Sequence, residues 1–351
     1  MKKKLLSVLM AAVMVAGVGG VGAAQVKADD EKILGAGIYS ASDNFNSYIG
    51  KAITNACDGI FKTNIEDGQN DQSTQNNQVD TMLAKGASVV AVSVCDVTAA
   101  PTLIQKCKDA GNVPIIFFNK EITDCDVINS YENAYQVTST GGDYGASIQA
   151  QMVIDYWKEH PEMDKNGDGK LQLVYLMGDP GHTASQPRCD YLKSTIEDAG
   201  IEIDLLAEDT GMWVTATSKE KMDAWVSKYG DEIECCVAGN DAMALGALSA
   251  VEAAGFNTDG EESSKYIPIY GIDALPEILS KIESGEITGS VLQDAKTQGQ
   301  TIVKMAENLT SGKDAVDGIE GVEMEEEAKA VRIPYQAITK DNLDLAKSTY
   351  E

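Results

Sequence analysis

Short apolar segments alternate with longer amphipathic segments along most of the chain. The apolar segments are rich in valine and isoleucine, and each leads into a stretch with the 3.6-residue period of a helix. The expected strands are Ile33–Tyr39, Lys62–Ile65, Ser88–Val94, Val113–Phe118, Tyr135–Val137, Leu171–Met177, Glu202–Ala207, Ile233–Ala238, Ile267–Ile272 and Ile287–Leu292. The expected helices are Phe45–Ile60, Ser73–Lys85, Pro101–Ala110, Tyr144–Glu159, Gln186–Ala199, Ser218–Lys228, Asp241–Ala254, Pro276–Glu283 and Gln298–Ser311. This order predicts an α/β fold with parallel sheets.

Glycine follows several of the predicted helices, as is typical of helix C-terminal caps. These glycines are Gly86, Gly111, Gly200, Gly255 and Gly285. About five strand–helix units precede residue 140 and a similar set follows, and 351 residues are too many for one ordinary core. We therefore expect two doubly wound parallel-sheet lobes.

The N-terminus has the pattern of a secretory signal peptide over residues 1–28. Three lysines precede an apolar run from Leu5 to Val21, and small residues follow. Cleavage before Asp29 is expected, with the Ala23–Ala24 region as the other site and a single membrane helix as the alternative interpretation. The first cysteine is Cys57, so we predict an exported, periplasmic or extracytoplasmic protein without a lipoprotein cysteine.

The charge of the chain argues against nucleic-acid binding. Removal of the predicted signal takes away four lysines and leaves 24 basic against 55 acidic residues, a net charge of −31. Such a field repels nucleic acids and anionic lipids. A DNA-binding regulator would also need a headpiece in place of the signal peptide.

The cysteine pattern does not resemble a disulfide framework. The cysteines are odd in number and form no CxxC pair. They are Cys57, Cys95, Cys107, Cys125, Cys189, Cys235 and Cys236. We expect most of them to be small core residues, with one disulfide as the alternative.

Polar residues recur where the predicted strands end, which is where open α/β sheets bind ligands. They are Asp43, Asp96, Asn119, His182, Arg188, Asn240, Asp273 and Gln293. Taken alone, each is better explained as a helix cap or loop residue, but their recurrence in both halves favours a site that pairs with hydroxyl groups. Phe45 and Trp213 are either core residues or aromatic faces for a pyranose ring, and the pattern alone leaves both open.

The segment "MDKNGDGKLQLVYL" begins like an EF-hand calcium loop. Asp164, Asn166 and Asp168 occupy positions one, three and five, and Gly169 follows at position six. Position twelve, a bidentate glutamate in EF-hands, is Tyr175. The segment is therefore either a solvated turn or a site that takes its last ligand from elsewhere in the chain.

Motifs spread over the whole mature chain resemble one family. They are "YSASDNFNS", "DGQNDQSTQNNQVDTMLAKG", "FFNKE", "GDPGH", "MDAW", "GNDAMALGA", "YGIDALPE" and "VRIPY" followed by "KDNL". Together they resemble the galactose/glucose-binding proteins of sugar ABC transporters, within the type I periplasmic binding protein family. The resemblance implies two lobes that close on a sugar as a hinge, and a monomer that delivers the sugar to an ABC permease or signals through a chemoreceptor.

The resemblance also implies where the chain passes between the lobes. The implied crossovers are near Thr138, Gln293 and Val331. The implied N-terminal lobe is 29–138 plus 294–330, and the implied C-terminal lobe is 139–293 plus 331–351.

Site residues carry over from the same resemblance. Asp43 would accept a sugar hydroxyl, and Phe45 and Trp213 would sandwich the ring. The polar rim would be completed by Asn119, His182, Arg188, Asn240 and Asp273, with Gln293 where the family has asparagine. Ala184 stands where the family has an aspartate, a change that weakens free-hexose binding or admits a glycoside, with Ser185 or water as a substitute. The preferred sugar is therefore left open between galactose, glucose and a galactoside.

The family's calcium site implies an answer for the EF-hand-like loop. The matching ligands are Asp164, Asn166, Asp168, the carbonyl of Lys170, the side chain of Gln172, and Glu234 as the distant glutamate. Calcium would have a structural role here, tying the loop to the strand at Glu234.

An enzyme is the main alternative from another class. His160 and His182 are the histidines of the chain, and neither has a nucleophile motif beside it. Asp43 and Asp273 are the candidates for a glycoside hydrolase pair. We expect a binding protein without catalytic residues, and release of reducing sugar from a glycoside would separate the two cases.

Overall fold

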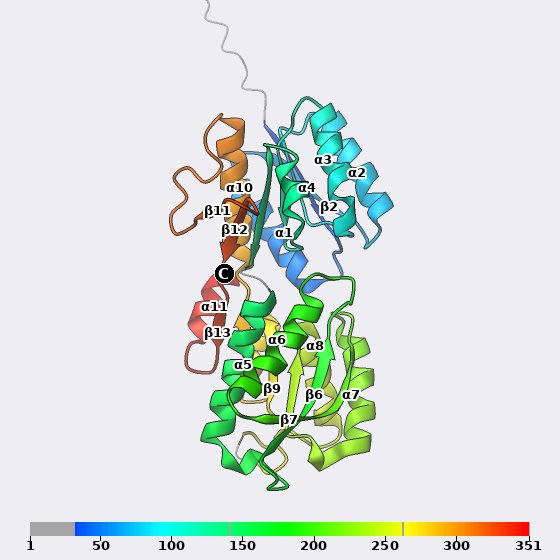
Figure 1. Ribbon diagram of the computed structural model, residues 1–351, viewed down its shortest axis with the longest axis vertical. Helices are drawn as coiled ribbons and strands as arrows, with labels where there is room; N and C mark the ends of the chain where they lie inside the picture. Colours follow the sequence, from blue (N-terminus) through cyan, green and yellow to red (C-terminus); the bar gives the residue numbers. More distant parts are fainter. Residues whose placement is uncertain (1–31, 140–141, 262, 351) are drawn as a thin grey trace, which may run out of the picture. The chain divides into compact units, whose positions relative to one another are not determined.

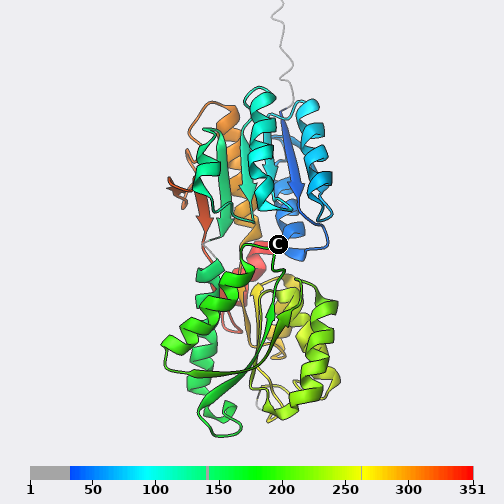
Figure 2. The same ribbon diagram turned by 45° about the vertical axis from the view of Figure 1, so that its right-hand side comes forward.

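A computed structural model describes residues 32–139, 142–261 and 263–350, so the predicted signal peptide lies outside the described residues. The described chain contains two sheets, each flanked by helices on both faces (Figures 1 and 2). We call each sheet with its helices a lobe. Two α/β lobes were predicted, and the structure confirms this fold class. No described helix has both the length and the apolar character needed to cross a bilayer.

The first lobe is built on a seven-stranded sheet in the order β11-β12-β5-β4-β3-β1-β2. Its strands are β1 (Ile33–Ile38), β2 (Lys62–Asp67), β3 (Val89–Val92), β4 (Ile115–Phe118), β5 (Ala134–Ser139), β11 (Met324–Glu325) and β12 (Ala330–Ile333). Its helices are α1 (Asn44–Ala56), α2 (Gln72–Ala84), the 3₁₀ turn η1 (Val97–Ala99), α3 (Ala100–Asp109), α4 (Cys125–Asn129) and α10 (Ala295–Thr310).

The second lobe has a six-stranded sheet in the order β13-β10-β9-β8-β6-β7. Its strands are β6 (Lys170–Met177), β7 (Glu202–Thr210), β8 (Cys235–Ala238), β9 (Ile269–Asp273), β10 (Gly289–Leu292) and β13 (Gln336–Ile338). Besides α10, eight helical elements follow β5 in the described residues. They are α5 (Gly142–Glu159), η2 (Pro161–Met163), α6 (Ser185–Asp198), α7 (Thr215–Tyr229), η3 (Gly230–Glu232), α8 (Asp241–Ala253), α9 (Pro276–Glu283) and α11 (Leu343–Tyr350).

Alternate residues of the first sheet enter two separate cores. In β3, Val89 and Ala91 pack with α1 and α10, whereas Val90 and Val92 pack with α2 and α3. Because both faces are covered, these strands read as continuous apolar runs rather than alternating ones. The second sheet repeats the arrangement, with α7, α8 and α9 on one face and α5 and α6 on the other.

Parallel pairing holds except at two sheet edges. There, β11 pairs antiparallel with β12, and β13 pairs antiparallel with β10. The prediction of parallel sheets was therefore incomplete. Strands of two and three residues carry too few positions to show a hydrophobic period.

The chain passes between the two sheets three times: between β5 and β6, between β10 and β11, and between β12 and β13. The crossover expected near Val331 falls inside β12, where Val331 pairs with Val137 of the first sheet. The prediction was therefore too early at this point, because Val331 to Ile333 belong to the first sheet and the passage follows them.

The five glycines predicted to cap helices all have positive φ angles, between 78° and 101°.

Candidate functional site

The strand ends of both lobes meet at one pocket with a volume of about 290 Å³. All nine residues predicted to bind sugar line it: Asp43, Phe45, Asn119, His182, Arg188, Trp213, Asn240, Asp273 and Gln293. Asp96, also singled out at a strand end, instead caps η1 and is largely exposed. The tertiary structure therefore separates a helix cap from the pocket residues, which a strand-end pattern alone does not.

Asp43 is held by two hydrogen bonds within the first lobe. Its Oδ1 accepts the Asn46 N–H at 2.7 Å as the N-cap of α1, and its Oδ2 accepts the Tyr39 hydroxyl at 2.6 Å. Burial raises the pKa of Asp43, while these two hydrogen bonds and the Lys120 charge oppose the rise. Lys120 lies 4.1 Å from the centre of the Tyr39 ring. Asp43 thus serves as both helix cap and pocket acceptor.

Asn119 and His182 bring the two lobes into contact at the pocket. The Nε2 atom of His182 lies 3.3 Å from Oδ1 of Asn119. Burial lowers the pKa of His182 well below its ordinary value, and the nearby positive charges of Lys120 and Arg188 lower it further. The neutral ring accepts the Ala184 N–H on Nδ1, so its own proton lies on Nε2 and is donated to Asn119.

The guanidinium of Arg188 links three parts of the second half of the chain. It donates to the Gly239 carbonyl at 2.6 Å, to Oε1 of Gln293 at 2.9 Å and to the Tyr335 hydroxyl at 3.1 Å. Its Nε atom is buried and has no hydrogen-bond partner within the described residues. Arg188 therefore gives the pocket a fixed positive charge.

Trp213 is placed by a strained loop and by two glycines. Met212 and Trp213 have φ angles of 56° and 62°. A Cβ atom on Gly178 would lie 2.0 Å from the Trp213 ring, and one on Gly239 would lie 3.2 Å from it. The ring makes an edge contact with His182 at 5.4 Å between centres. The indole consequently occupies space that any other residue at position 178 would fill.

Phe45 and Trp213 each pack in or against a hydrophobic core and also line the pocket. Phe45 is 4% exposed and belongs to the core around α1, yet it also lines the pocket. Trp213 is partly buried against the core of the second lobe and lines the same pocket.

Asp273 and Asn240 lie at the carboxyl ends of two neighbouring strands of the second sheet. Asn240 caps α8 by accepting the Met243 N–H at 3.0 Å. Asp273 ends β9, with a φ angle of 125°, and is 3% exposed. Burial raises its pKa well above the ordinary value; the Asp241 charge adds to the rise and Arg188 opposes it.

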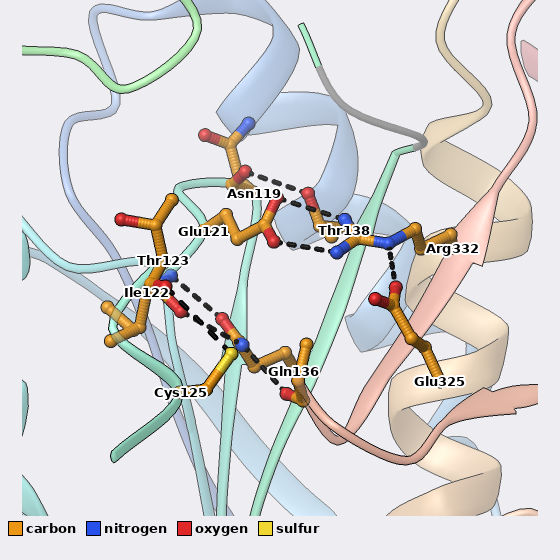
Figure 3. A network of polar contacts seen from close by, with 10 residues as sticks. Asn119, Glu121, Ile122, Thr123, Cys125, Gln136, Thr138, Glu325 and Arg332 are labelled. Atoms are coloured by element: carbon orange, nitrogen blue, oxygen red, sulfur yellow. Dashed lines mark hydrogen bonds and ion pairs between the residues drawn. The ribbon is translucent and has the colours of Figure 1, made fainter. Parts of the chain in front are cut away.

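The loop that carries Asn119 is held by a polar network of the first lobe (Figure 3). Arg332 of β12 pairs through both terminal nitrogens with Glu121, at 2.7 and 2.9 Å, and through Nε with Glu325 of β11. Gln136 of β5 accepts the Ile122 N–H at 2.8 Å. These contacts connect the pocket loop to the strand that precedes the third passage between the sheets.

Several pocket residues were not predicted from the sequence: Tyr39, Glu121, Thr123, Thr138, Ser139, Thr183, Pro187, Tyr191 and Tyr335. Tyr39 stood at a predicted strand end beside Asp43, a signal that would have found it. Tyr191 and Tyr335 gave none, because one lies inside a helix and the other follows a crossover.

The predicted calcium ligands gather at one end of β6. Asp164, Asn166 and Asp168 accept N–H groups of their own loop, at distances of 2.8 to 3.0 Å. Glu234 accepts the Lys165 N–H at 2.6 Å and the Gln172 N–H at 3.0 Å, so it lies against the loop.

Two observations bear on whether these residues suit a calcium ion. The Oε1 atom of Gln172 is buried and lacks a hydrogen-bond partner in the described chain. All the predicted donors are oxygens, which calcium prefers. However, the described residues contain no group of three or more His, Cys, Asp or Glu side chains placed to hold a metal ion. The oxygen donors fit a calcium ion in their chemistry, but the described carboxylates do not converge on a single point.

All seven cysteines are free thiols, and all seven lie within the described chain. Cys57, Cys107, Cys189, Cys235 and Cys236 are buried, as expected of core residues. The alternative of one disulfide is not realised among them.

Comparison with known proteins identifies the family. Residues 36–314 match the family described as periplasmic binding protein domain. The chain belongs to the periplasmic binding protein family. It is 42% identical over 313 residues to the D-galactose/methyl-galactoside binding periplasmic protein MglB of Haemophilus influenzae, covering 88% of this chain and 90% of that protein.

Other members are more distant. The chain is 30% identical over 308 residues to a putative rhizopine-binding protein of Rhizobium meliloti, covering 85% of this chain and 88% of the relative. Among solved structures, an ABC transporter solute binding protein from Bacillus halodurans C-125 with bound myo-inositol is 27% identical and aligns with a TM-score of 0.72. That alignment covers 91% of this chain and 98% of the other. The periplasmic binding protein fold therefore spans almost all of the described residues.

Proposed function

We propose that this protein captures a monosaccharide, either galactose, glucose or a galactoside, and delivers it to the permease of an ABC transporter. The observation that carries the proposal is the convergence of nine predicted sugar-binding residues on one pocket. Carboxylates, amides and a guanidinium can pair with the hydroxyls on the rim of a pyranose, and Phe45 and Trp213 offer aromatic faces. The 42% identity to a galactose-binding relative supports the same ligand class.

Selectivity in such a pocket comes from the cost of unmatched polar groups. Arg188, Asn240, Asp273 and Gln293 are at most 6% exposed. A ligand that lacks a hydroxyl where one of these groups needs a partner leaves that group buried and unpaired. Ala184 offers the pocket no polar side chain, so galactosides with a substituent on the ring are included in the proposal.

Ligand binding is proposed to favour a closed arrangement of the two lobes, which the permease then recognises. Such proteins act outside the cytoplasm, and export through the N-terminal signal fits this role. A chemoreceptor is a further proposed partner for the same closed form. Small-angle scattering at saturating sugar should show a smaller radius of gyration, and an unchanged radius would contradict closure.

We propose a binding role rather than glycoside hydrolysis, with Asp43 and Asp273 as ligand acceptors. Both relatives described above are named as binding proteins. Incubation with a galactoside should release no reducing sugar, and steady release would contradict the proposal.

Calcium is proposed as a structural ion at the loop that begins at Asp164. Asp164, Asn166, Asp168, the Lys170 carbonyl, Gln172 and Glu234 would hold it, and its charge would neutralise the loop carboxylates. The partnerless Oε1 of Gln172 supports this assignment.

The decisive experiment is calorimetric titration of the mature protein with glucose, galactose and methyl β-galactoside in parallel. Micromolar or tighter binding of at least one is expected. Asp273→Asn should weaken it at least tenfold, whereas the matched variant Asp96→Asn, at a strand end outside the pocket, should not. Absence of binding to all three sugars would overturn the proposed function.

A further inference from the structure

Asp241 is a fully buried carboxylate that immediately follows the pocket residue Asn240 in the sequence. It begins α8, and its side chain has no exposed surface. Its Oδ1 accepts the Ser290 hydroxyl at 2.6 Å, and its Oδ2 accepts the Leu275 N–H at 2.7 Å. A buried charge in such a position is costly unless both oxygens are paired, as they are here.

The two bonds converge on the backbone that follows Asp273. Ser290 Oγ, which donates to Asp241, also accepts the Ala274 N–H at 3.1 Å. Asp241 therefore holds Leu275 directly and Ala274 through Ser290. One carboxylate on α8 thereby ties β10 to the turn between β9 and α9.

That turn is strained. Asp273 and Ala274 have φ angles of 125° and 51°, in a region that residues with a Cβ atom rarely adopt. Such backbone persists only where surrounding contacts hold it. Besides the Asp241 network, the Asp273 carbonyl accepts the Tyr350 hydroxyl at 3.0 Å and the Gln293 N–H at 3.3 Å.

The neighbouring strand leaves space for the Asp241 carboxylate. A Cβ atom on Gly271 of β9 would lie 2.2 Å from Asp241 Oδ1. Glycine at this position therefore lets the carboxylate lie against the strand that ends in Asp273. The arrangement is specific to this carboxylate and is not simply general core packing.

We infer that Asp241 is a positioning residue for the sugar pocket, which holds the strained turn that presents Asp273 to the ligand. The inference rests on the proposed function, because it concerns how Asp273 meets a sugar hydroxyl. Asp241 contributes through Ser290, Ala274 and Leu275 and does not itself contact the ligand.

The charge of Asp241 has a second effect on Asp273, which can be tested separately from the hold on the turn. Burial raises the pKa of Asp241 to about 7, while Ser290 and Leu275 oppose the rise; Glu277 of α9 adds to it and Arg188 of α6 opposes it. Asp273 faces Asp241, Arg188 and Asp43, and Tyr350 of α11 faces both aspartates. Removing the Asp241 charge should lower the pKa of Asp273, so that Asp273 stays ionised to lower pH.

The test compares the sugar affinity, its pH profile and the thermal midpoint of four variants with those of the intact protein. Asp241→Ala and Ser290→Ala break the hold on the turn and should weaken sugar binding at least tenfold. Asp241→Asn can still accept from Leu275 and donate to Ser290, so its affinity at neutral pH should stay within about threefold. Its loss of affinity on acidification should occur at lower pH than in the intact protein.

The matched control is Asn257→Ala. Asn257 is 2% exposed and bonds the Ile267 and Glu286 backbone of the same lobe, away from the pocket residues. It should lower the thermal midpoint and leave sugar affinity within twofold. If Asp241→Ala fails to fold, Ser290→Ala carries the affinity test alone.

Two results would overturn the inference while leaving the proposed function intact. One is sugar affinity within twofold of the intact protein for Ser290→Ala and Asp241→Ala. The other is a combined result: Asp241→Asn loses sugar affinity at the same acidic pH as the intact protein, and Asn257→Ala weakens sugar binding as much as Asp241→Ala does. Absence of sugar binding by the intact protein would instead reject the proposed function, and this inference with it.

Discussion

Arg188 donates a hydrogen bond of 2.9 Å from Nη2 to the side-chain oxygen of Gln293, next to the point where the chain leaves the second sheet. The same nitrogen donates to Tyr335, which follows the last passage between the sheets. One side chain therefore joins the pocket to two of the three segments that connect the lobes. The pocket lining and the connections between the lobes meet at this guanidinium.

Replacing Arg188 with lysine should strongly weaken sugar binding. A single ammonium group cannot reproduce the planar fork that reaches Gly239, Gln293 and Tyr335 together. Loss of hydrogen bonds to a charged group costs roughly 1.5–3 kcal/mol each, so we expect a decrease in affinity of at least tenfold by calorimetry. Lys193→Arg serves as the control, because Lys193 is half-buried on the same helix, pairs with Glu208 and lies outside the pocket lining. Equal affinity in Arg188→Lys and the intact protein would contradict this role.

Tyr39→Phe should weaken sugar binding and shift its pH dependence. The Tyr39 hydroxyl donates to Asp43 and lowers the pKa of that carboxyl, so its removal raises the Asp43 pKa. Because the ionised carboxylate is the form that accepts a sugar hydroxyl, binding should be lost at higher pH in the variant as the solution is acidified. Affinity at neutral pH should fall by about 1–3 kcal/mol.

The control for this prediction is Tyr144→Phe, which changes an exposed tyrosine of α5. Calorimetry between acid and neutral pH measures both effects. A profile for Tyr39→Phe that overlays that of Tyr144→Phe would show that the Asp43 hydrogen bond does not tune the site.

Gly178→Ala should displace Trp213 from the pocket. The added Cβ would lie 2.0 Å from the indole, far below any real contact distance, and the ring must move. Sugar binding should fall at least tenfold, and the change in tryptophan fluorescence on sugar addition should diminish. Gly37→Ala adds the same methyl group at 3.5 Å from its nearest neighbour and should leave both signals unchanged.

Ala184→Asp should favour free hexoses over glycosides. Ala184 lines the pocket, and its N–H donates to His182, so a carboxylate here would add an acceptor without removing that contact. The ratio of galactose to methyl β-galactoside affinity should rise in Ala184→Asp and change little in Ala184→Ser. A ratio unaltered by the carboxylate would place position 184 away from the substituent.

Removal of calcium should lower thermal stability and leave the sugar pocket intact. At a calcium concentration 100-fold above its dissociation constant, one site contributes about 2.7 kcal/mol. At roughly 2–4 °C per kcal/mol, chelation should lower the thermal midpoint by about 5–10 °C. Glu234→Gln should abolish this dependence, while Glu232→Gln on the neighbouring exposed turn should retain it. A thermal midpoint insensitive to chelator in the intact protein would reject the calcium assignment.

The element pattern was largely predictable because its signal is local. Runs such as Val89–Val92 and Ile115–Phe118 are short, apolar and bounded by polar residues, so they read as buried strands from sequence alone. The strands β11, β12 and β13 were all missed, and β11 and β13, with two and three residues, are too short to display a period. The passage at Val331 was placed too early because strand pairing with Val137, a distant partner, decides where β12 ends.

The candidate site shows the same difference between local sequence signals and contacts between distant segments. By itself the sequence determined the residue types that can pair with a sugar and their places at strand ends, since chemistry and periodicity are local properties. Only the tertiary structure decided that Asp96 caps a turn, that Tyr191 and Tyr335 line the pocket, and that the buried Asp241 carboxylate bonds the turn after Asp273. These outcomes depend on contacts between segments far apart in the chain, whose geometry follows from how both sheets pack and not from neighbouring residues.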